Sequence, residues 1–375
     1  MGPIQRHPAR GPAQRDRTCL TRPAGSLPGR TLLLRRTVPS HPFRIREIAV
    51  QAGLSEATVD RVLNGRSGVR DSTAREVRAA IADLERQRDQ VRLAGRAFVI
   101  DVVMQAPARF SSAVRAALEA ELPLLRPAVI RARFHFRETG PAGHLLETLD
   151  GIGRRGTQGV ILKAPDTAEI NESVARLTAR RIPVVTLVTD LPRSPRAAYV
   201  GIDNRAAGAT AAYLITQWLG RRPGAVLVTL SRSFFRGEEE REMGFRSALW
   251  SMQPSRRVVD VTETDGLDAA IRGLVVKALD AEGPVPAAYS IGGGNTAILD
   301  AFAESGRPEP LLIAHDLDED NIRLLRGGRV AAVLHHDLRV DVRRASQVIM
   351  SAQNALPGFA VAPSAIQVVT PYNVP

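Results

Sequence analysis

Two histidine–aspartate groups are the most reactive combinations of side chains in this sequence. His315-Asp316 and His335-His336-Asp337 each end a short apolar run, and such groups could bind a metal ion or transfer a proton. No His-Glu-x-x-His zinc motif and no Gly-x-Ser-x-Gly nucleophile motif accompanies them, and the single cysteine is Cys19. The glycines of "SIGGGNTAI" lack the Gly-Lys-Ser/Thr of a phosphate-binding loop. We therefore expect no enzyme, no cofactor and no metal site, and we expect these residues to line a binding pocket.

Short apolar runs recur from residue 97 onward and alternate with amphipathic stretches of helical period. The runs are residues 97–104, 159–165, 183–190, 225–230, 256–263, 287–292, 311–316 and 330–337. Such runs between helices are typical of parallel strands covered on both faces, so we predict an α/β body of two doubly wound parallel-sheet subdomains. Ligands of such sheets bind beyond the carboxyl ends of the strands. Asp190 and Phe110 are therefore candidate contacts, although a lone phenylalanine is more often a core residue.

Residues 43–90 have the apolar period of three short helices. The first is predicted over residues 44–52, the second follows an N-cap at Ser55, and the third starts near Thr73. The outward face of the second helix consists of Glu56, Ala57, Thr58, Asp60, Arg61 and Asn64. Short side chains near a helix N-terminus let the backbone approach a surface closely, as in a recognition helix in the DNA major groove. The alternative is an ordinary helical hairpin.

The formal net charge of +12 is concentrated near the N-terminus. Residues 1–42 contribute +7, residues 43–96 contribute +3 and residues 97–375 contribute +2. This distribution fits a nucleic-acid-binding head on a nearly neutral body, although arginine-rich tails are common and often have no specific role. The seven prolines of residues 1–42 and their lack of apolar period predict a disordered tail. No run is long enough for a membrane span or a signal-peptide core, so we expect a cytoplasmic, nucleoid-associated protein.

The segment "REIAVQAGLSEATVDRVLN" resembles the DNA-binding head of lactose-repressor-type (LacI/GalR) transcriptional regulators. Glu47 through Asn64 follow the family pattern D/E-(I/V)-A-x-x-A-G-V-S-x-x-T-V-S-R-V-L-N closely. The resemblance implies contacts with bases or phosphates for Ser55, Glu56, Ala57, Thr58, Arg61 and Asn64. Asp60 departs from the pattern, because the family usually has serine there. A carboxylate near DNA repels phosphates but accepts a hydrogen bond from a cytosine amino group, so an unusual operator sequence is expected.

The segment "VRLAGRAFVIDVV" resembles the end of the hinge helix of the same family. In the family this helix inserts a leucine into the DNA minor groove, which implies a hinge over residues 91–96 and a DNA contact for Leu93. The family's Tyr-x-Pro-Asn before the hinge is absent, and "ERQRDQ" takes its place. A plain charged linker is the alternative interpretation.

Residues 97–375 resemble the periplasmic-sugar-binding-protein type I fold that the family uses as its sensor. In "YVGIDNRAAG" the resemblance implies that Asp203 faces the ligand, and the alternative role of this residue is the N-cap of the next helix. In "REMGFRSAL" it implies that Arg241 reaches ligand hydroxyls, and the alternative is a surface salt bridge. The resemblance also places Asp316 on sugar hydroxyls and His336 where relatives have glutamine.

These features predict a sequence-specific DNA-binding transcriptional regulator, most simply a repressor. Its expected partners are double-stranded operator DNA, a second copy of the chain in a homodimer, and a sugar, polyol or sugar phosphate bound between the two lobes. The alternatives are a sugar-binding protein that serves a transporter and a sugar-processing enzyme. The expected organisation is a tail (1–42), an all-α helix-turn-helix head (43–90), a hinge (91–96) and an effector-binding body (97–375).

Overall fold

The computed structural model describes residues 42–66, 68–93, 95–125, 128–231, 235–262, 264, 268–358 and 360–375. The chain divides into two compact units, Met1–Ile81 and Ala82–Pro375. The predicted tail of residues 1–42 lies outside the described residues, except for Pro42. None of the described helices combines the length and the apolar character that a membrane span requires.

The first unit contains α1 (Ile45–Ala52), α2 (Glu56–Leu63) and the start of α3 (Asp71–Leu93). Gly53 ends α1 with a φ of 64°, which costs glycine little, and the hydroxyl of Ser55 accepts a hydrogen bond from the Thr58 N–H at 3.2 Å. Ile48, Val59 and Val77 are fully buried between the helices. The predicted first two helices and their caps are therefore confirmed.

The third helix differs from its prediction at both ends. It begins at Asp71, two residues before Thr73, and it continues to Leu93. The helix therefore extends past residue 90, where the sequence suggested a hinge, and Ala94 lies outside the described residues.

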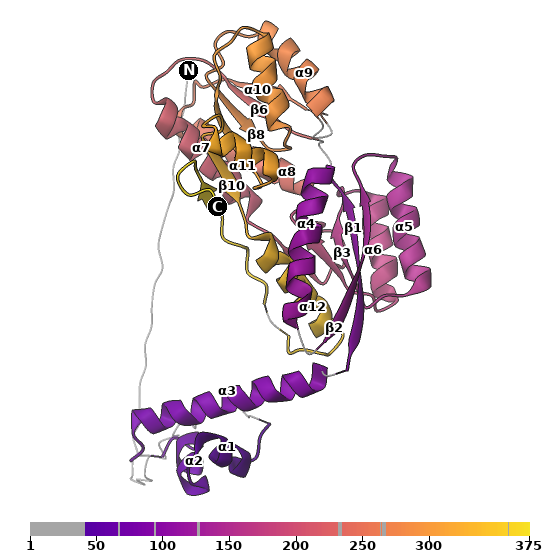
Figure 1. Cartoon of the computed structure of the whole chain (residues 1–375), viewed down its shortest axis with the longest axis vertical. Helices are drawn as coiled ribbons and strands as arrows, with labels where there is room; N and C mark the ends of the chain where they lie inside the picture. Colours follow the sequence, from indigo (N-terminus) through magenta and orange to yellow (C-terminus); the bar gives the residue numbers. More distant parts are fainter. Residues whose placement is uncertain are drawn as a thin grey trace, which may run out of the picture. The chain divides into compact units, whose positions relative to one another are not determined.

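Lobe 1 of the second unit is a five-stranded parallel sheet with the order β2-β1-β3-β4-β5. Its strands are β1 (Ala97–Gln105), β2 (Val129–Arg137), β3 (Gly159–Lys163), β4 (Val184–Leu187) and β5 (Ala198–Val200). The helices are α4 (Ala108–Glu121), the short 3-10 helix Leu122–Leu125, α5 (Ala142–Arg155), α6 (Ala168–Ala179) and α12 (Leu338–Ala352). Figure 1 shows α4 and α12 on one face of the sheet and α5 and α6 on the other.

Lobe 2 is a six-stranded sheet with the order β11-β10-β9-β8-β6-β7, in which only the edge strand β11 is antiparallel to its neighbour. Its strands are β6 (Val226–Thr229), β7 (Val258–Val261), β8 (Ala287–Ser290), β9 (Leu311–His315), β10 (Ala332–His335) and β11 (Gln367–Val369). Its helices are α7 (Asn204–Leu219), α8 (Arg236–Met252), α9 (Asp268–Asp280), α10 (Asn295–Glu304) and α11 (Glu319–Arg326). The first two cover one face of the sheet and the other three cover the opposite face.

The two doubly wound lobes confirm the predicted α/β body, and each of the eight predicted apolar runs contains a strand. The alternating sequence of β2 was missed, because an edge strand has one face that is only half-buried and does not read as a continuous apolar run. The chain crosses between the lobes after β5, after β10 and before β11. The crossing segments after β5 and before β11 are hydrogen-bonded to each other, since the Ser364 N–H donates to the carbonyl of Gly201 at 2.8 Å.

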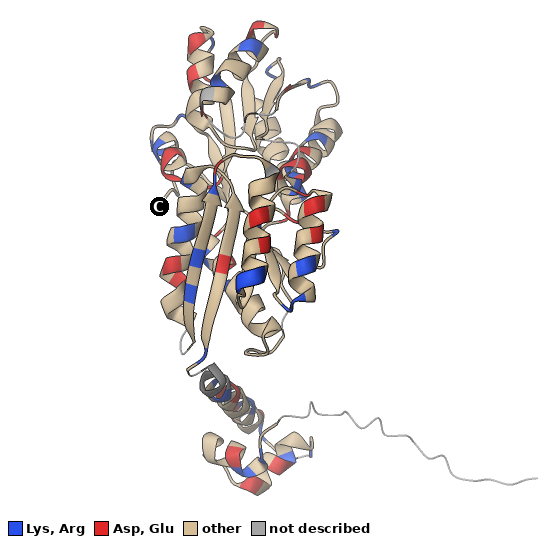
Figure 2. Ribbon diagram, turned by 90° about the vertical axis from the view of Figure 1, so that its right-hand side faces the viewer, with Lys and Arg blue, Asp and Glu red and all other residues tan. Residues whose placement is uncertain are grey.

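The charge of the second unit is mixed over its surface. Figure 2 shows acidic and basic positions interspersed along the outer helices of both lobes. Several of these charges form pairs, such as Arg246 with Glu242 at 2.8 Å and Arg272 with Glu304 at 2.7 Å. This pattern agrees with the formal charge of only +2 that residues 97–375 carry.

Candidate functional site

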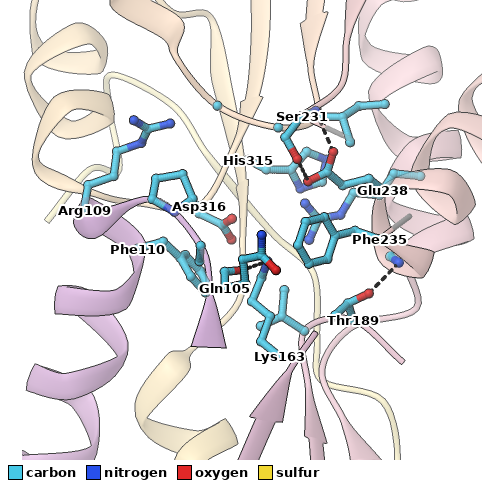
Figure 3. Close-up of a pocket in the computed structure, with 18 of the residues that line it drawn as sticks. Gln105, Arg109, Phe110, Lys163, Thr189, Ser231, Phe235, Glu238, His315 and Asp316 are labelled. Atoms are coloured by element: carbon cyan, nitrogen blue, oxygen red, sulfur yellow. Dashed lines mark hydrogen bonds between the residues drawn. The ribbon is translucent and has the colours of Figure 1, made fainter. Parts of the chain in front are cut away.

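A pocket lies between the two lobes, where the carboxyl ends of their parallel strands face each other (Figure 3). Lobe 1 contributes Gln105, Ala106, Pro107, Arg109, Phe110, Glu138, Lys163, Val188 and Thr189. Lobe 2 contributes Ser231, Phe235, Gly237, Glu238, Arg241, Ile291, Gly292, Gly293, His315, Asp316 and Asp318. Three of the predicted ligand contacts, Phe110, Arg241 and Asp316, are brought together here.

Lys163 is the last residue of β3 and extends into the pocket between two aromatic rings. Its ammonium nitrogen lies 4.1 Å from the ring centroid of Phe235 and 5.9 Å from that of Phe110, and it donates to the carbonyl of Gln105 at 3.3 Å. Among the described residues it pairs with no carboxylate within 4 Å. Burial lowers the pKa of Lys163 to about 8, although the negative charges of Glu238 and Asp316 oppose this effect. Lys163 therefore still carries a positive charge near neutral pH.

Arg241 lies on α8 and is only 3% exposed. Its Nε donates to the side-chain oxygen of Asn204 at 2.9 Å, but its Nη2 has no hydrogen-bond partner among the described residues. No described carboxylate forms an ion pair with it. This environment excludes the alternative of an exposed surface salt bridge, and it leaves an unsatisfied donor at the pocket.

Two carboxylates of the pocket, Glu238 and Asp318, already have hydrogen-bond donors. Glu238 accepts from the backbone N–H of Ser231 at 2.8 Å and from its hydroxyl at 2.5 Å. Asp318 accepts from the N–H of Asn321 at 2.8 Å, and its other oxygen lies 3.3 Å from Nε of Arg109. Burial raises the pKa of Asp318, in spite of these two donors.

Asp316 meets the pocket at the end of β9, in a left-handed backbone conformation with a φ of 63°. This conformation is uncommon for residues other than glycine and is often found at functional sites. Burial disfavours ionisation of Asp316, but the contact with His336 and the charge of Arg241 outweigh it and lower its pKa. The carboxylate is therefore ionised across the physiological range.

His336 does not line the pocket, contrary to its prediction as a ligand contact. It is fully buried behind Asp316, with Nε2 3.6 Å from an oxygen of Asp316 and Nδ1 2.5 Å from an oxygen of Asp341. Burial alone would lower the pKa of His336, but the two carboxylates raise it to about 9. The positive charge of His336 beside Asp316 favours the ionised form of that carboxylate.

His315 is the histidine that does line the pocket. Its Nε2 shares a hydrogen bond of 2.7 Å with the hydroxyl of Tyr289, and its Nδ1 has no partner among the described residues. Burial and the nearby charge of Arg241 lower the pKa of His315, so the ring is neutral. Within the described part of the chain, no group of three or more His, Cys, Asp or Glu residues is arranged to hold a metal ion.

The structure does not bring Asp190 and Asp203 to this pocket, which corrects two predicted contacts. Asp190 forms an ion pair with Arg196, with a hydrogen bond of 2.5 Å from Nη2, and also accepts from the hydroxyl of Thr186 at 2.8 Å. Asp203 caps α7 by accepting from the N–H of Ala206 at 3.0 Å, which was its alternative interpretation. Both residues follow strands, but their carboxylates serve the local backbone and neighbouring side chains of the crossover region.

The outward face of α2 holds the predicted DNA contacts. Ser55, Glu56, Ala57, Arg61 and Asn64 are exposed. Thr58 is half-buried, and its hydroxyl lies 2.8 Å from that of Ser55. The first turn of α2 therefore presents small side chains and free backbone amides to the outside. Leu93 is the last residue of α3, and its predicted role in a hinge stays a prediction.

Asp60 is paired within the head. Its carboxylate accepts from the side-chain amide of Asn64 at 2.7 Å and lies 3.2 Å from a guanidinium nitrogen of Arg66. The neighbouring positive charge reduces the repulsion from DNA phosphates that an unpaired carboxylate would cause. The side-chain amide nitrogen of Asn64 also donates to the carbonyl of Asp60 at 2.9 Å, so its predicted phosphate contact would require one of these two bonds to be exchanged.

Comparison with known protein families gives two matches along the chain. Residues 44–88 match the family described as bacterial regulatory proteins of the lacI family, and residues 149–356 match the periplasmic binding protein domain. The first match covers the head with α2, and the second covers most of lobe 2 and the part of lobe 1 from the second half of α5 onward.

Curated relatives carry names of transcriptional regulators. The HTH-type transcriptional regulator reg1 of Streptomyces lividans is 32% identical over 176 residues, which are 44% of this chain and 47% of the relative. The HTH-type transcriptional regulator MalR of Streptomyces coelicolor is 31% identical over 174 residues, with the same coverage of both chains. The chain thus spans about half the length of the curated relatives it matches.

Solved structures share the fold of the body at lower identity. A glucose-galactose binding protein from Geobacillus stearothermophilus has a TM-score of 0.67 at 20% identity and covers 75% of this chain and 99% of its own. A solute binding protein from Burkholderia graminis, in complex with D-arabinose, has a TM-score of 0.66 at 18% identity, with 75% and 97% covered. At this identity the likeness establishes the two-lobed fold.

Proposed function

Because the chain belongs to the periplasmic binding protein domain family and carries a lacI-type regulatory region ahead of that domain, we propose that it is a ligand-responsive, sequence-specific DNA-binding transcriptional regulator. The observation that carries the proposal is the exposed face of α2, a helix of the lacI type, in the same chain as a two-lobed pocket with unsatisfied polar groups. A repressor is the simplest form of such a regulator. The proposed site of action is the nucleoid.

In this proposal α2 lies in the major groove of operator DNA. Glu56, Ala57 and Arg61 face base edges, while the N-terminal backbone amides near Ser55 and Thr58 face phosphates. Leu93 would enter the minor groove from the end of α3. Two copies of the chain would present two α2 helices to the half-sites of a near-palindromic operator.

The ligand of the pocket would be a small hydroxylated molecule. Solved relatives whose names state a sugar or a polyol include the arabinose complex and a Bacillus halodurans solute binding protein with bound myo-inositol. Aromatic rings such as Phe110 and Phe235 would cover the apolar face of such a molecule, and the charged groups around them would bind its hydroxyls. Binding would change the operator affinity only through a difference in ligand affinity between two states of the protein.

A sugar-binding protein that serves a transporter is the alternative, and the match of residues 44–88 to regulatory proteins favours the regulator. The test is selection of preferred duplexes from random DNA, followed by fluorescence anisotropy on the selected sequence at several salt concentrations. Arg61→Ala should weaken binding to the selected duplex by about 1–3 kcal/mol. Arg272→Ala, which removes an exposed arginine of the body, should leave the affinity unchanged. Absence of any enriched duplex would rule the regulator out.

A further inference from the structure

Two cations at the pocket form no ion pair with any described carboxylate. Lys163 is one of only two lysines in a chain with 51 lysines and arginines, and its ammonium contacts a carbonyl and two aromatic rings. Arg241 is 3% exposed, and its Nη2 has no hydrogen-bond partner among the described residues. Lys163 belongs to lobe 1 and Arg241 to lobe 2, so the two cations approach the pocket from opposite sides.

The acidic residues of the pocket differ from the two cations, because each has a partner within the protein. Glu238 accepts hydrogen bonds from Ser231, and Asp318 accepts one from Asn321 and pairs with Arg109. Asp316 forms an ion pair with His336, whose Nε2 lies 3.6 Å away. Glu138 accepts from the N–H of Ala108 at 2.6 Å. The described residues of the pocket therefore leave Lys163 and Arg241 to be paired by a negatively charged hydrogen-bond acceptor.

Buried charges in proteins are almost always paired, because removing an unpaired ion from water costs several kcal/mol. Hydroxyl groups of a neutral sugar would accept hydrogen bonds from the two cations, whose charges would then be balanced only by Glu238 and Asp316, which form no ion pair with them. A carboxylate with two oxygens could accept from both cations at once, in charge-assisted bonds that are roughly twice as strong as neutral ones. A phosphate dianion fits less well than a carboxylate, since it would place a second negative charge near Glu238 and Asp316.

We propose that the ligand of this pocket is a hydroxylated carboxylic acid of sugar size, whose carboxylate lies between Lys163 and Arg241. The proposal rests on the proposed function only in taking the pocket as the ligand site. The carbon skeleton lies against Phe110 and Phe235, and the hydroxyls meet Glu238, Asp316 and His315. Because the carboxylate contacts one residue of each lobe, it favours the closed arrangement of the lobes more than a neutral analogue does.

The experiment is titration calorimetry of the full chain with three matched pairs of probes. The pairs are D-glucuronate and D-glucose, D-galacturonate and D-galactose, and D-gluconate and D-glucitol. At least one acid should bind roughly tenfold or more tightly than its neutral partner, the ratio that about 1.4 kcal/mol gives. Equal or tighter binding of the neutral partner in all pairs overturns the proposal, as does a lack of binding by all three acids. Tighter binding of D-glucose 6-phosphate than of any acid also overturns it.

Variants of the two lysines test whether Lys163 causes the preference for the acid over its neutral partner. Lys163→Met should abolish the preference for the acid, and Lys163→Arg should restore part of it. Lys277→Met changes the other lysine, which is exposed on α9, and should keep the full preference. A preference that survives Lys163→Met overturns the assignment, and thermal unfolding checks that each variant is folded. Binding of the selected DNA duplex is measured separately on the same samples. If only the ligand proposal is wrong, the acids show no preference but the duplex still binds; if the proposed function is wrong, no duplex binds.

Discussion

His336 shows how one buried residue affects the charge of another that lines the pocket. It lies between Asp316, at the pocket, and Asp341, at the first turn of α12 in lobe 1. Asp341 in turn accepts from the hydroxyl of Ser364, on the crossing before β11. The contacts therefore run from the pocket to two segments that connect the lobes.

Replacement of His336 by glutamine should remove a pH-dependent part of the stability. The pKa of His336 is raised from 6.5 to about 9 in the folded chain, so its contribution is complete below pH 6.5 and is lost as the pH rises through 9. The difference in unfolding free energy between wild type and His336→Gln should fall by about 1–3 kcal/mol over this window. Urea unfolding between pH 6 and 9.5 measures it, and a difference that stays constant would show that His336 is not charged by its neighbours.

The packing of α7 against α8 is the element-scale feature that positions Arg241. Gly208 of α7 lies directly against the backbone of α8, and a Cβ there would overlap the carbonyl oxygen of Arg241. Gly244 of α8 approaches the carbonyl of Arg205 in the same way. The two glycines let the helices approach closely, and this contact sets where the Arg241 side chain enters the pocket.

Gly208→Ala should therefore destabilise the chain, because the added methyl has no space without a shift of α8. Overpacking of this kind costs about 1–3 kcal/mol, and the shift of Arg241 should weaken ligand binding as well. Gly273→Ala is the matched control, since a Cβ on this residue of α9 meets nothing within 4 Å. The control should be neutral or gain about 0.5–1 kcal/mol from helix propensity. Equal effects of the two substitutions, measured by chemical unfolding, would contradict this account of the helix contact.

At the scale of the whole molecule, three crossing segments join the two lobes. A ligand bound between the lobes would therefore act on the angle between them. The first and third crossings are linked through Gly201 and Ser364, and the second carries His336. A ligand that contacts both lobes would restrict them together. Under the proposed function, this change reaches the operator through the energy difference between two states of the protein.

Thermodynamic linkage makes this coupling testable without knowledge of the path that carries it. If the ligand changes operator affinity by a given factor, the operator must change ligand affinity by the same factor. Calorimetric titration of the ligand with and without the selected duplex should therefore show a factor of about 5–150. The ligand-dependent change in DNA affinity, measured by anisotropy, should agree with it. Identical ligand affinities in the two titrations would show that the pocket does not regulate the DNA-binding head.

Features that depend on neighbouring residues in the chain could be predicted from the sequence. Helix caps such as Ser55 and the buried parallel strands could be predicted, because capping and apolar period are properties of neighbouring residues. The position of Phe110 after a strand made it a candidate in the same way, whereas Arg241 and Asp316 were predicted through the family resemblance. The strand β2 was not predicted, because the apolar residues of this edge strand alternate with polar ones and do not form a continuous apolar run.

Only the tertiary structure decided which strand-end residues share the pocket. Asp203 and Lys163 both stand at strand ends or just beyond them, yet one caps a helix and the other faces the opposite lobe. Local sequence does not distinguish these fates, because they depend on contacts between segments far apart in the chain. The surroundings of Lys163 and Arg241, in which no described carboxylate pairs with either, arise in the same way, because the pocket is lined by residues of both lobes.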